Sequence, residues 1–276
     1  MTDDLVTRFE RDGFVHVRSV FTEAEASAHA RAVDQAVLQR TGCDPQTLEG
    51  AQQPFVACLW LWEDCPEVRP LTFHPAVGAL AARLVGAPTV RLWHDQSLYK
   101  QKGGVETAPH QDKAVIPLSG KIVTAWIPLQ DVTEENGCMG YFPGSQALRT
   151  EYDEFGRPRD GSLQQWLASA GPVFVPARKG DVIFHCEGTL HMAAPNRTDA
   201  PRRAYTMTFF ADGATRASAA PHPALDRAKI GLGEKADSAV TPIAWPLSGG
   251  RQPDPAPWTN RSPAEHAAKE RGILPR

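Results

Sequence analysis

The chain has 276 residues, of which 42% are apolar, and its formal net charge is −3. This length suits one large domain, because sandwiches and barrels often reach it as a single unit. The small negative charge argues against a protein that binds nucleic acid or an anionic membrane electrostatically. Five cysteines without a Cys-x-x-Cys pair indicate free thiols rather than a disulfide framework or a structural zinc site.

The opening residues, MTDDLVTRFERDG, are charged and lack the apolar core of a signal peptide. No apolar run approaches the roughly 18 residues that a membrane span needs. We therefore expect a cytoplasmic protein with no membrane partner and no nucleic-acid partner.

The first 88 residues or so predict a mainly helical flank. The apolar periodicity indicates helices at 3–12, 23–40 and 74–85, with a short strand over 14–17. Thr22 and Glu25 match a capping box ahead of the second helix. A glycine follows each helix as a stop signal.

From about residue 89 to 212 the chain changes to short runs rich in Val, Ile, Trp, Tyr and Phe, separated by turn residues. Such runs predict strands, and regular short strands favour a sandwich or jelly roll. The expected strands lie at 90–101, 122–130, 140–142, 173–175, 181–185 and 204–210.

The last segment, about 213–276, is rich in Pro, Ala and charged residues and has few strand signals. Trp245 and Trp258 suggest that it packs on the body of the protein. It could form a lid over the mouth of a barrel, pack on the surface without a role at the site, or form an interface between copies. We expect one domain over 1–276, with a helical flank, a jelly-roll core and this C-terminal extension.

The motif His110-Gln111-Asp112 is the strongest chemical signal in the chain. In an extended segment, residues i and i+2 point to the same face, so His110 and Asp112 can meet one metal ion. A histidine and a carboxylate with one distant histidine form the facial triad of non-haem Fe(II) sites. The alternative is a simple turn after Gly103-Gly104.

Two histidines compete for the third ligand position. His191 follows a predicted strand and precedes a Pro-Asn turn. His185 ends that strand, and it could equally be a buried histidine of the core. The residues by themselves leave both open.

Arg202 lies eleven residues after His191, and Arg203 follows it at the start of the last predicted strand. The two side chains point to opposite faces, so only one can enter a barrel. A buried arginine without an anion would be unfavourable. The carboxylate of a co-substrate would satisfy it through two parallel hydrogen bonds. The alternative is an exposed arginine pair.

Three stretches resemble the phytanoyl-CoA dioxygenase family of Fe(II)/2-oxoglutarate oxygenases. They are residues 94–112, with HDQSLYKQKGG and APHQD, residues 124–146, with TAWIPLQDVTEENGCMGYFPGSQ, and residues 180–205, with GDVIFHCEGTLHMAAPNRTDAPRRAY. The resemblance covers roughly residues 5–212. It implies a mainly β fold with flanking helices, a double-stranded β-helix of the cupin-like jelly-roll type.

The resemblance also implies roles for individual residues. His110, Asp112 and His191 would bind Fe(II), which favours His191 over His185, and Arg202 would bind the distal carboxylate of 2-oxoglutarate. Further contacts to the co-substrate are expected from Gln111, Trp126 and Gln96.

Two positions bear on the chemistry that the resemblance implies. Family members often have Ser or Thr where this chain has Ala193, so one hydrogen bond to the co-substrate is missing or replaced. The intact carboxylate of Asp112 favours hydroxylation over halogenation, because halogenases of the family lack it.

The activity implied is hydroxylation of an unactivated C–H bond in a small molecule or specialised metabolite, with O2 consumed and succinate and CO2 released. The alternatives are a cupin-type metal enzyme that does not use 2-oxoglutarate and a silent ligand-binding protein. Desaturation, epimerisation or cyclisation would use the same residues. Three tryptophans, Trp60, Trp62 and Trp93, are candidates for a pocket wall, although clustered aromatics are more often core.

Overall fold

The structure is a computed structural model that describes residues 2–49, 55–148, 162–258, 263–270 and 273–274. Its centre is a large antiparallel sheet with the strand order β1-β8-β5-β10-β3-β11, to which β2 adds by pairing with β3. Its strands are β1 (Phe14–Val17), β2 (Phe55–Leu59), β3 (Val90–Lys100), β5 (Ile122–Pro128), β8 (Val182–Cys186), β10 (Arg202–Ala211) and β11 (Ile243–Trp245).

A second sheet of four short strands has the order β4-β9-β6-β7. The strands are β4 (Thr107–His110), β6 (Met139–Tyr141), β7 (Val173–Val175) and β9 (His191–Ala193). The two sheets face each other, and the apolar side chains between them include Trp126 of the large sheet and Met139 of the small one. This is the jelly roll that the sequence predicts.

The long strands β3 and β10 pair along their whole length, with Arg202 opposite Lys100 and Thr206 opposite Gln96. Every residue of β5 is buried, because this strand lies between β8 and β10 and is covered on both faces. One face of the large sheet lies against the helices, and the opposite face lines the interior of the jelly roll.

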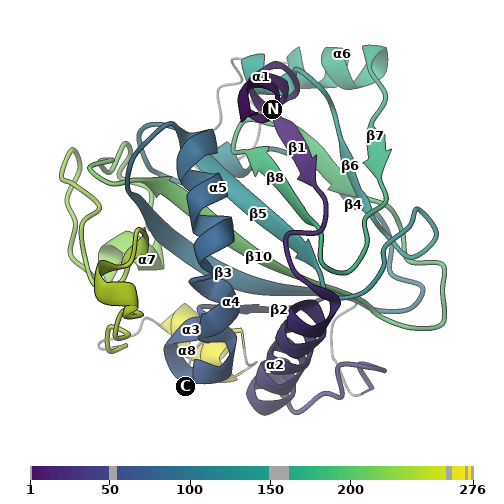
Figure 1. The fold of residues 1–276 in the computed structure, drawn as a ribbon, viewed down its shortest axis with the longest axis horizontal. Helices are drawn as coiled ribbons and strands as arrows, with labels where there is room; N and C mark the ends of the chain where they lie inside the picture. Colours follow the sequence, from purple (N-terminus) through teal and green to yellow (C-terminus); the bar gives the residue numbers. More distant parts are fainter. Residues whose placement is uncertain (1, 50–54, 149–161, 259–262, 271–272, 275–276) are drawn as a thin grey trace.

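The helices lie mainly on the outer face of the large sheet, where α5 crosses the strands (Figure 1). They are α1 (Thr2–Asp12), α2 (Glu23–Thr41), α3 (Leu61–Asp64), α4 (Arg69–Thr72), α5 (Pro75–Val85), α6 (Ser162–Ser169), α7 (Pro223–Asp226) and α8 (Pro263–Glu270). Short 3-10 turns occur at Pro66–Val68, Asp112–Ala114, Ser145–Ala147 and Ser248–Gly250.

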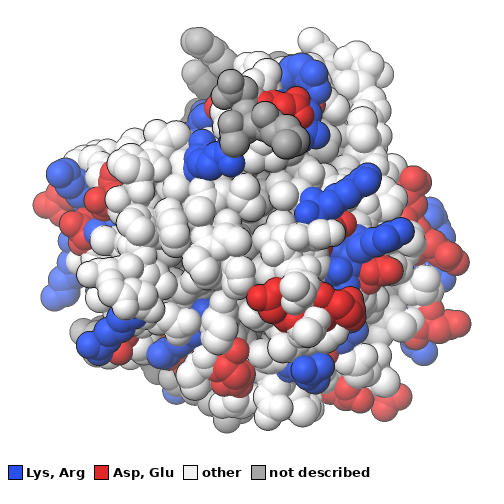
Figure 2. All heavy atoms as spheres, in the orientation of Figure 1, with Lys and Arg blue, Asp and Glu red and all other residues white. Residues whose placement is uncertain are grey.

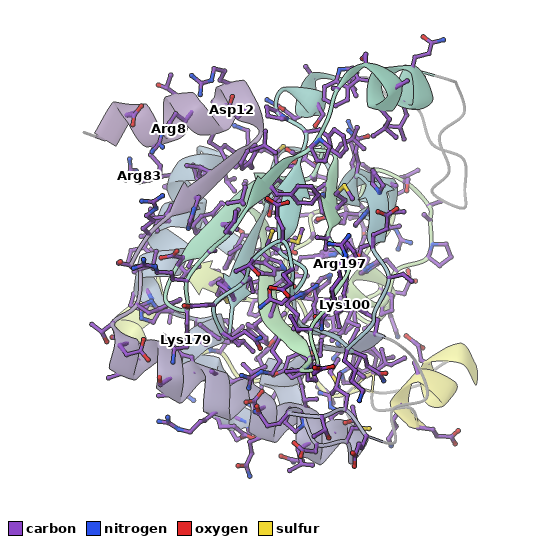
Figure 3. The ribbon with its side chains drawn as sticks, turned by 90° about the vertical axis from the view of Figure 1, so that its right-hand side faces the viewer. Arg8, Asp12, Arg83, Lys100, Lys179 and Arg197 are labelled. Carbon is purple, nitrogen blue, oxygen red and sulfur yellow. The ribbon has the colours of Figure 1, made fainter. Side chains whose placement is uncertain are left out.

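The capping box predicted for α2 is present. Thr22 accepts a hydrogen bond from the Glu25 backbone N–H, and the Glu25 carboxylate accepts one from the Thr22 N–H. Gly42 ends the helix in the left-handed conformation, at a φ of 75°. Lys179 lies beside α2 (Figure 3), where its ammonium group pairs with Glu23 at 2.6 Å.

The structure confirms the six strands predicted between residues 89 and 212, each within a few residues. It adds β2, β4, β9 and β11, which the sequence did not indicate. β4 and β9 are only four and three residues long, and β4 contains a proline, so neither gives a periodic signal.

The C-terminal extension packs on the body, as Trp245 and Trp258 suggest. The Trp258 ring lies 5.5 Å from the Trp60 ring, and the Arg227 guanidinium lies 3.7 Å over Trp258. Arg227 also forms a two-pronged ion pair with Glu63 of α3, at 2.9 and 3.0 Å, and both side chains are buried. This pair joins the extension to the helical flank.

On the face drawn in Figure 2, basic and acidic side chains lie interspersed beside a broad uncharged area. Over the described ranges, no helix combines the length and the hydropathy that crossing a bilayer requires.

Replacing Arg227 by methionine should lower the free energy of unfolding by about 3 kcal/mol, because the Glu63 carboxylate then stays buried without its cation. Urea denaturation measures the change. The matched control is Arg251→Met, which removes an exposed ion pair with Asp254 and should change little. Equal midpoints for the Arg227 variant and wild type would show that the pair does not stabilise the extension.

Candidate active site

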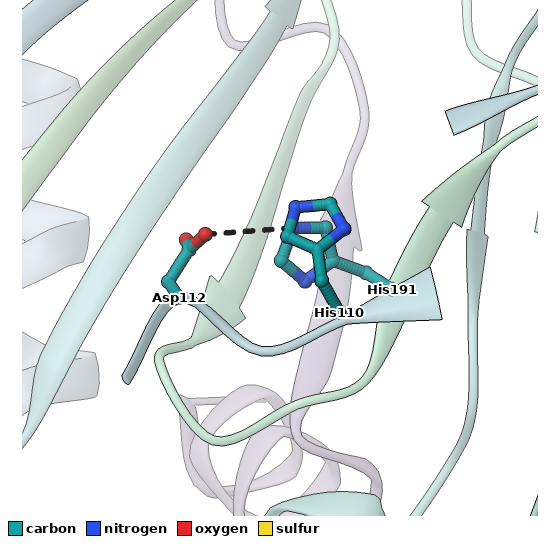
Figure 4. A group of neighbouring side chains, drawn as sticks. All are labelled: His110, Asp112 and His191. Carbon is teal, nitrogen blue, oxygen red and sulfur yellow. Dashed lines mark ion pairs between the residues drawn. The ribbon is translucent and has the colours of Figure 1, made fainter. Parts of the chain in front are cut away.

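His110 and His191 face each other across the small sheet, as directly paired residues of β4 and β9. Asp112 lies just beyond the end of β4. The three side chains converge (Figure 4), and their candidate ligand atoms all lie within 4.8 Å of one another. The carboxylate of Asp112 is 3.7 Å from Nε2 of His191. No other such group of three occurs in the described part of the chain.

Hydrogen bonds to the backbone fix both imidazole rings. Nδ1 of His110 lies 2.8 Å from the carbonyl of Ala108, and Nδ1 of His191 lies 2.9 Å from that of Thr189. A carbonyl only accepts, so each Nδ1 carries a proton, and in the neutral ring Nε2 is the nitrogen with the free lone pair. Second-sphere bonds of this kind orient metal-binding histidines.

The protonation states also suit a metal ion. Burial lowers the pKa of His191 to about 3, although Asp112 opposes the shift. Burial by itself would raise the pKa of Asp112, but the nearby His191 and the hydrogen bond from His185 hold it well below its usual range. A metal ion binds neutral imidazole and ionised carboxylate, and His191 and Asp112 are in these protonation states.

His185, the rival third ligand, lies beside the group without being part of it. Its Nε2 is 3.3 Å from the Asp112 carboxylate, and its Nδ1 is 3.3 Å from the hydroxyl of Tyr141. The carboxylate can only accept, so Nε2–H donates to Asp112, and Nδ1 of the neutral ring accepts from the phenol. Thr124 donates to the same carboxylate oxygen at 3.3 Å. His185 therefore holds Asp112 in place.

Arg202 points into the jelly roll and is 2% exposed, whereas Arg203 points outward and pairs with Asp34. The Arg202 guanidinium donates to the carbonyl of Leu98 at 2.9 Å and lies 5.6 Å from the Trp126 ring. Its Nε is buried without a partner, and no carboxylate pairs with it in the described ranges. Burial lowers its pKa only to about 10, so it remains a cation that lacks an anion.

A cavity of about 290 Å³ joins the three convergent side chains to Arg202. Gln96 and Trp126 line it, and the indole N–H of Trp126 is buried without a partner among the described residues. Gln111 does not line it. That side chain is buried and donates to the carbonyl of Gly188, so it fixes the loop behind the site.

The cavity is also lined by residues that the sequence did not indicate, among them His94, His222 and Thr208. His94 lies two residues before Gln96 on β3, so strand alternation could have placed it on the same face. His222 comes from the C-terminal extension, and no motif marks it. Of the three tryptophans proposed as a pocket wall, Trp93 lines the cavity, whereas Trp60 and Trp62 are core residues.

A family model described as phytanoyl-CoA dioxygenase (PhyH) matches residues 9–204. The chain belongs to the phytanoyl-CoA dioxygenase family. The mouse phytanoyl-CoA dioxygenase domain-containing protein 1 is 33% identical over 154 residues, which cover 51% of this chain and 52% of the mouse protein. The chain thus spans about half the length of the curated relatives it matches first.

Two other proteins extend the comparison over more of the chain. The methylphosphonate hydroxylase of Gimesia maris is 24% identical over 221 residues, covering 76% of this chain and 80% of that protein. The crystal structure of the non-haem α-ketoglutarate-dependent carbocyclase SnoK from nogalamycin biosynthesis matches with a TM-score of 0.75 at 28% identity. That match covers 88% of this chain and 96% of SnoK.

The epimerase SnoN is also similar, in a structure complexed with Fe3+, α-ketoglutarate and nogalamycin RO. Its TM-score is 0.70 at 28% identity, and the match covers 88% of this chain and 98% of SnoN. These neighbours share the double-stranded β-helix fold that the sequence predicts.

Replacing His185 by phenylalanine should weaken binding of Co(II) about 10- to 100-fold, the usual effect of losing a second-sphere partner. Tyr141→Phe should have a smaller effect, because it removes only the bond that sets the His185 tautomer. Anaerobic Co(II) titration followed by the visible d–d bands measures both. A His185 variant with wild-type affinity would rule out the positioning role.

The metal-free protein should lose stability as the pH falls below 6.5. Burial lowers the pKa of His94 to about 4 and that of His222 to about 3. In the unfolded chain both titrate near 6.5, so between pH 6.5 and about 4 only the unfolded state binds these protons. Each histidine then removes about 1.4 kcal/mol of stability per pH unit.

Urea denaturation at pH 7 and pH 5 measures this loss of unfolding free energy. His94→Gln should reduce the loss by the contribution of one histidine. Asp95 has the opposite effect, because burial raises its pKa to about 6 and the folded state binds the extra proton. The comparison of variant with wild type cancels that contribution. The expectation fails if both proteins lose the same free energy between the two pH values.

Proposed function

We propose that this protein is an Fe(II)- and 2-oxoglutarate-dependent oxygenase that acts on a small molecule. In this proposal Fe(II) binds to Nε2 of His110, the carboxylate of Asp112 and Nε2 of His191. Two imidazoles and one carboxylate on one side of the ion are the donor set that leaves positions open for other ligands.

The observation that supports 2-oxoglutarate as the co-substrate is the buried cation of Arg202. A buried guanidinium without an anion is unfavourable, and a carboxylate that meets its unpartnered Nε–H would remove the cost. The unpartnered indole N–H of Trp126 lies on the same wall of the cavity. A dicarboxylate with one end at Arg202 and its keto acid end at the iron fits this arrangement.

The chain's residues would bind, orient and shield the reactants. Arg202 would fix the far end of 2-oxoglutarate, and Gln96 of β3 supplies a polar group on the same face of the large sheet. Met139 and Met192 add apolar surface to the cavity wall beside these polar groups. When bound, iron with 2-oxoglutarate and O2 supplies the oxidation of an unactivated C–H bond and releases succinate and CO2.

We infer hydroxylation as the outcome, since the carboxylate ligand Asp112 is intact and leaves no position for a halide. A relative that is a methylphosphonate hydroxylase supports this outcome. Two structural neighbours are described as a carbocyclase and an epimerase, so cyclisation and epimerisation are the other reactions to test.

The decisive experiment is an anaerobic titration of the protein with Fe(II) and 2-oxoglutarate, recorded as the weak visible charge-transfer band of an iron-chelated keto acid. Wild type should give the band, and His110→Ala should abolish it. Arg202→Ala should raise the apparent Kd for 2-oxoglutarate by roughly 30-fold or more, because a buried charge pair is lost.

The matched control is Arg203→Ala, which removes the neighbouring arginine from the outer face and should leave the band unchanged. If metal-loaded wild type gives no band, 2-oxoglutarate is not a co-substrate and a cupin-type metal enzyme replaces this proposal. If the band forms, succinate release serves to screen substrates.

A further inference from the structure

The cavity has two chemically different ends. β10 runs along it from Arg202 to Thr208, a separation of about 20 Å at ~3.3 Å per residue. Arg202 marks one end. In the sheet, Thr208 lies opposite Thr124 of β5 on one side and opposite His94 of β3 on the other. The Thr124 hydroxyl donates a hydrogen bond to the Asp112 carboxylate. Thr208 and His94 thus line the end of the cavity opposite Arg202.

The C-terminal extension supplies a wall of that second end. The His222 ring stacks on Trp93 with centroids 4.3 Å apart, and both residues line the cavity. The extension is folded around Arg216, which donates to the carbonyls of Ala220 and Ile230 and pairs with Asp226 at 2.9 Å. Asp226 in turn accepts from the His222 backbone N–H at 2.8 Å, so the turn that presents His222 is held from within the extension.

The backbone sets the tautomer of His222. The N–H of Ala224 donates to Nδ1 of His222 at 3.2 Å, so Nδ1 carries no proton and Nε2 does. Burial lowers the pKa of His222 to about 3, with His94 and Arg216 acting in the same direction, and the imidazole is neutral. The ring therefore offers one neutral N–H donor.

The other polar groups at this end are neutral too. Burial lowers the pKa of His94 to about 4, and its Nδ1 is buried without a partner in the described ranges. The indole N–H of Trp93 is also buried and unpartnered there. Thr124 and Thr208 are hydrogen-bonded to each other at 3.0 Å. Buried polar groups without partners are rare and favour a ligand that completes their bonds.

The charges of the loaded site balance. Among the described residues that line the cavity, Asp112 is the only Asp or Glu and Arg202 is the only Lys or Arg. This charge balance rests on the proposed function. Fe(II) and Arg202 supply three positive charges, and the Asp112 carboxylate and the two carboxylates of 2-oxoglutarate supply three negative charges. A charged substrate would find no counter-ion among these described residues, and burying an unpaired charge is costly.

We propose that His222 is a specificity-determining residue of the C-terminal extension, whose Nε2–H donates a hydrogen bond to an oxygen of an uncharged, largely apolar substrate. The stacked rings of His222 and Trp93 form the wall against which a flat part of that substrate packs. His222 lies outside residues 9–204, which the family model matches. Substrate choice is thus set by a segment outside the family's common core.

The test uses four probes with the same ring: 2-naphthylmethanol, 2-naphthoate, 2-naphthylmethylamine and 2-methylnaphthalene. Each is titrated calorimetrically into the anaerobic Fe(II)–2-oxoglutarate protein. The alcohol should bind at least about tenfold more tightly than the anion and the cation, since neither charge finds a partner. It should also bind about fivefold more tightly than the hydrocarbon, through one hydrogen bond.

His222→Phe keeps the stack on Trp93 and removes the donor, so the alcohol should lose its advantage over the hydrocarbon. His222→Gln restores an N–H donor and should recover part of it. The matched control is His29→Phe, which changes a half-buried histidine of α2 outside the cavity and should bind all four probes as wild type does.

The charge-transfer band is recorded in the same samples, so the two proposals are separated. A wild type without the band refutes the oxygenase assignment. With the band present, three results would each overturn the inference: no probe binds, 2-naphthoate binds as tightly as the alcohol, or His222→Phe leaves the alcohol's advantage intact.

Discussion

The site depends on one cross-strand pair, because His110 and His191 lie directly opposite each other where two very short strands meet. Their rings are 4.2 Å apart between centroids, which brings two nitrogen donors to one point without any long-range adjustment. A shift of one residue in either strand would turn one ring to the other face of the sheet. The backbone carbonyls of Ala108 and Thr189 then orient the rings, so strand register and local hydrogen bonds together determine the donor geometry.

The large sheet adds the second requirement, a cation held inside a protein core. Arg202 and Arg203 are neighbours with opposite surroundings: the outer one pairs with Asp34, while the inner one keeps a buried nitrogen without a partner. The unfavourable burial of Arg202 is tolerated because β10 is paired on both sides, by β3 and β5. The stability of the strand pairs therefore maintains a binding group that would otherwise favour solvent.

Much of this could be read from the sequence, and the missing parts have physical reasons. Apolar alternation located the long strands, and the Thr22–Glu25 capping box located α2, because both signals are local. β4 and β9 were not indicated as strands, since three or four residues carry no period. The inward direction of Arg202 followed from strand alternation, together with the family resemblance. His222 could not be found, because its place in the cavity depends on how the extension folds around Arg216.

The ion pair between Glu63 and Arg227 has an evolutionary consequence. It anchors the extension to α3 of the helical flank and not to the strands that carry His110, Asp112 and His191. Insertions, deletions or replacement of residues around 216–230 can therefore reshape one wall of the cavity while the oxidising centre keeps its geometry. Related proteins could acquire new substrates by replacement of this segment alone. The replacement segment would have to keep an arginine at the position of Arg227, and the flank would have to keep the acid Glu63.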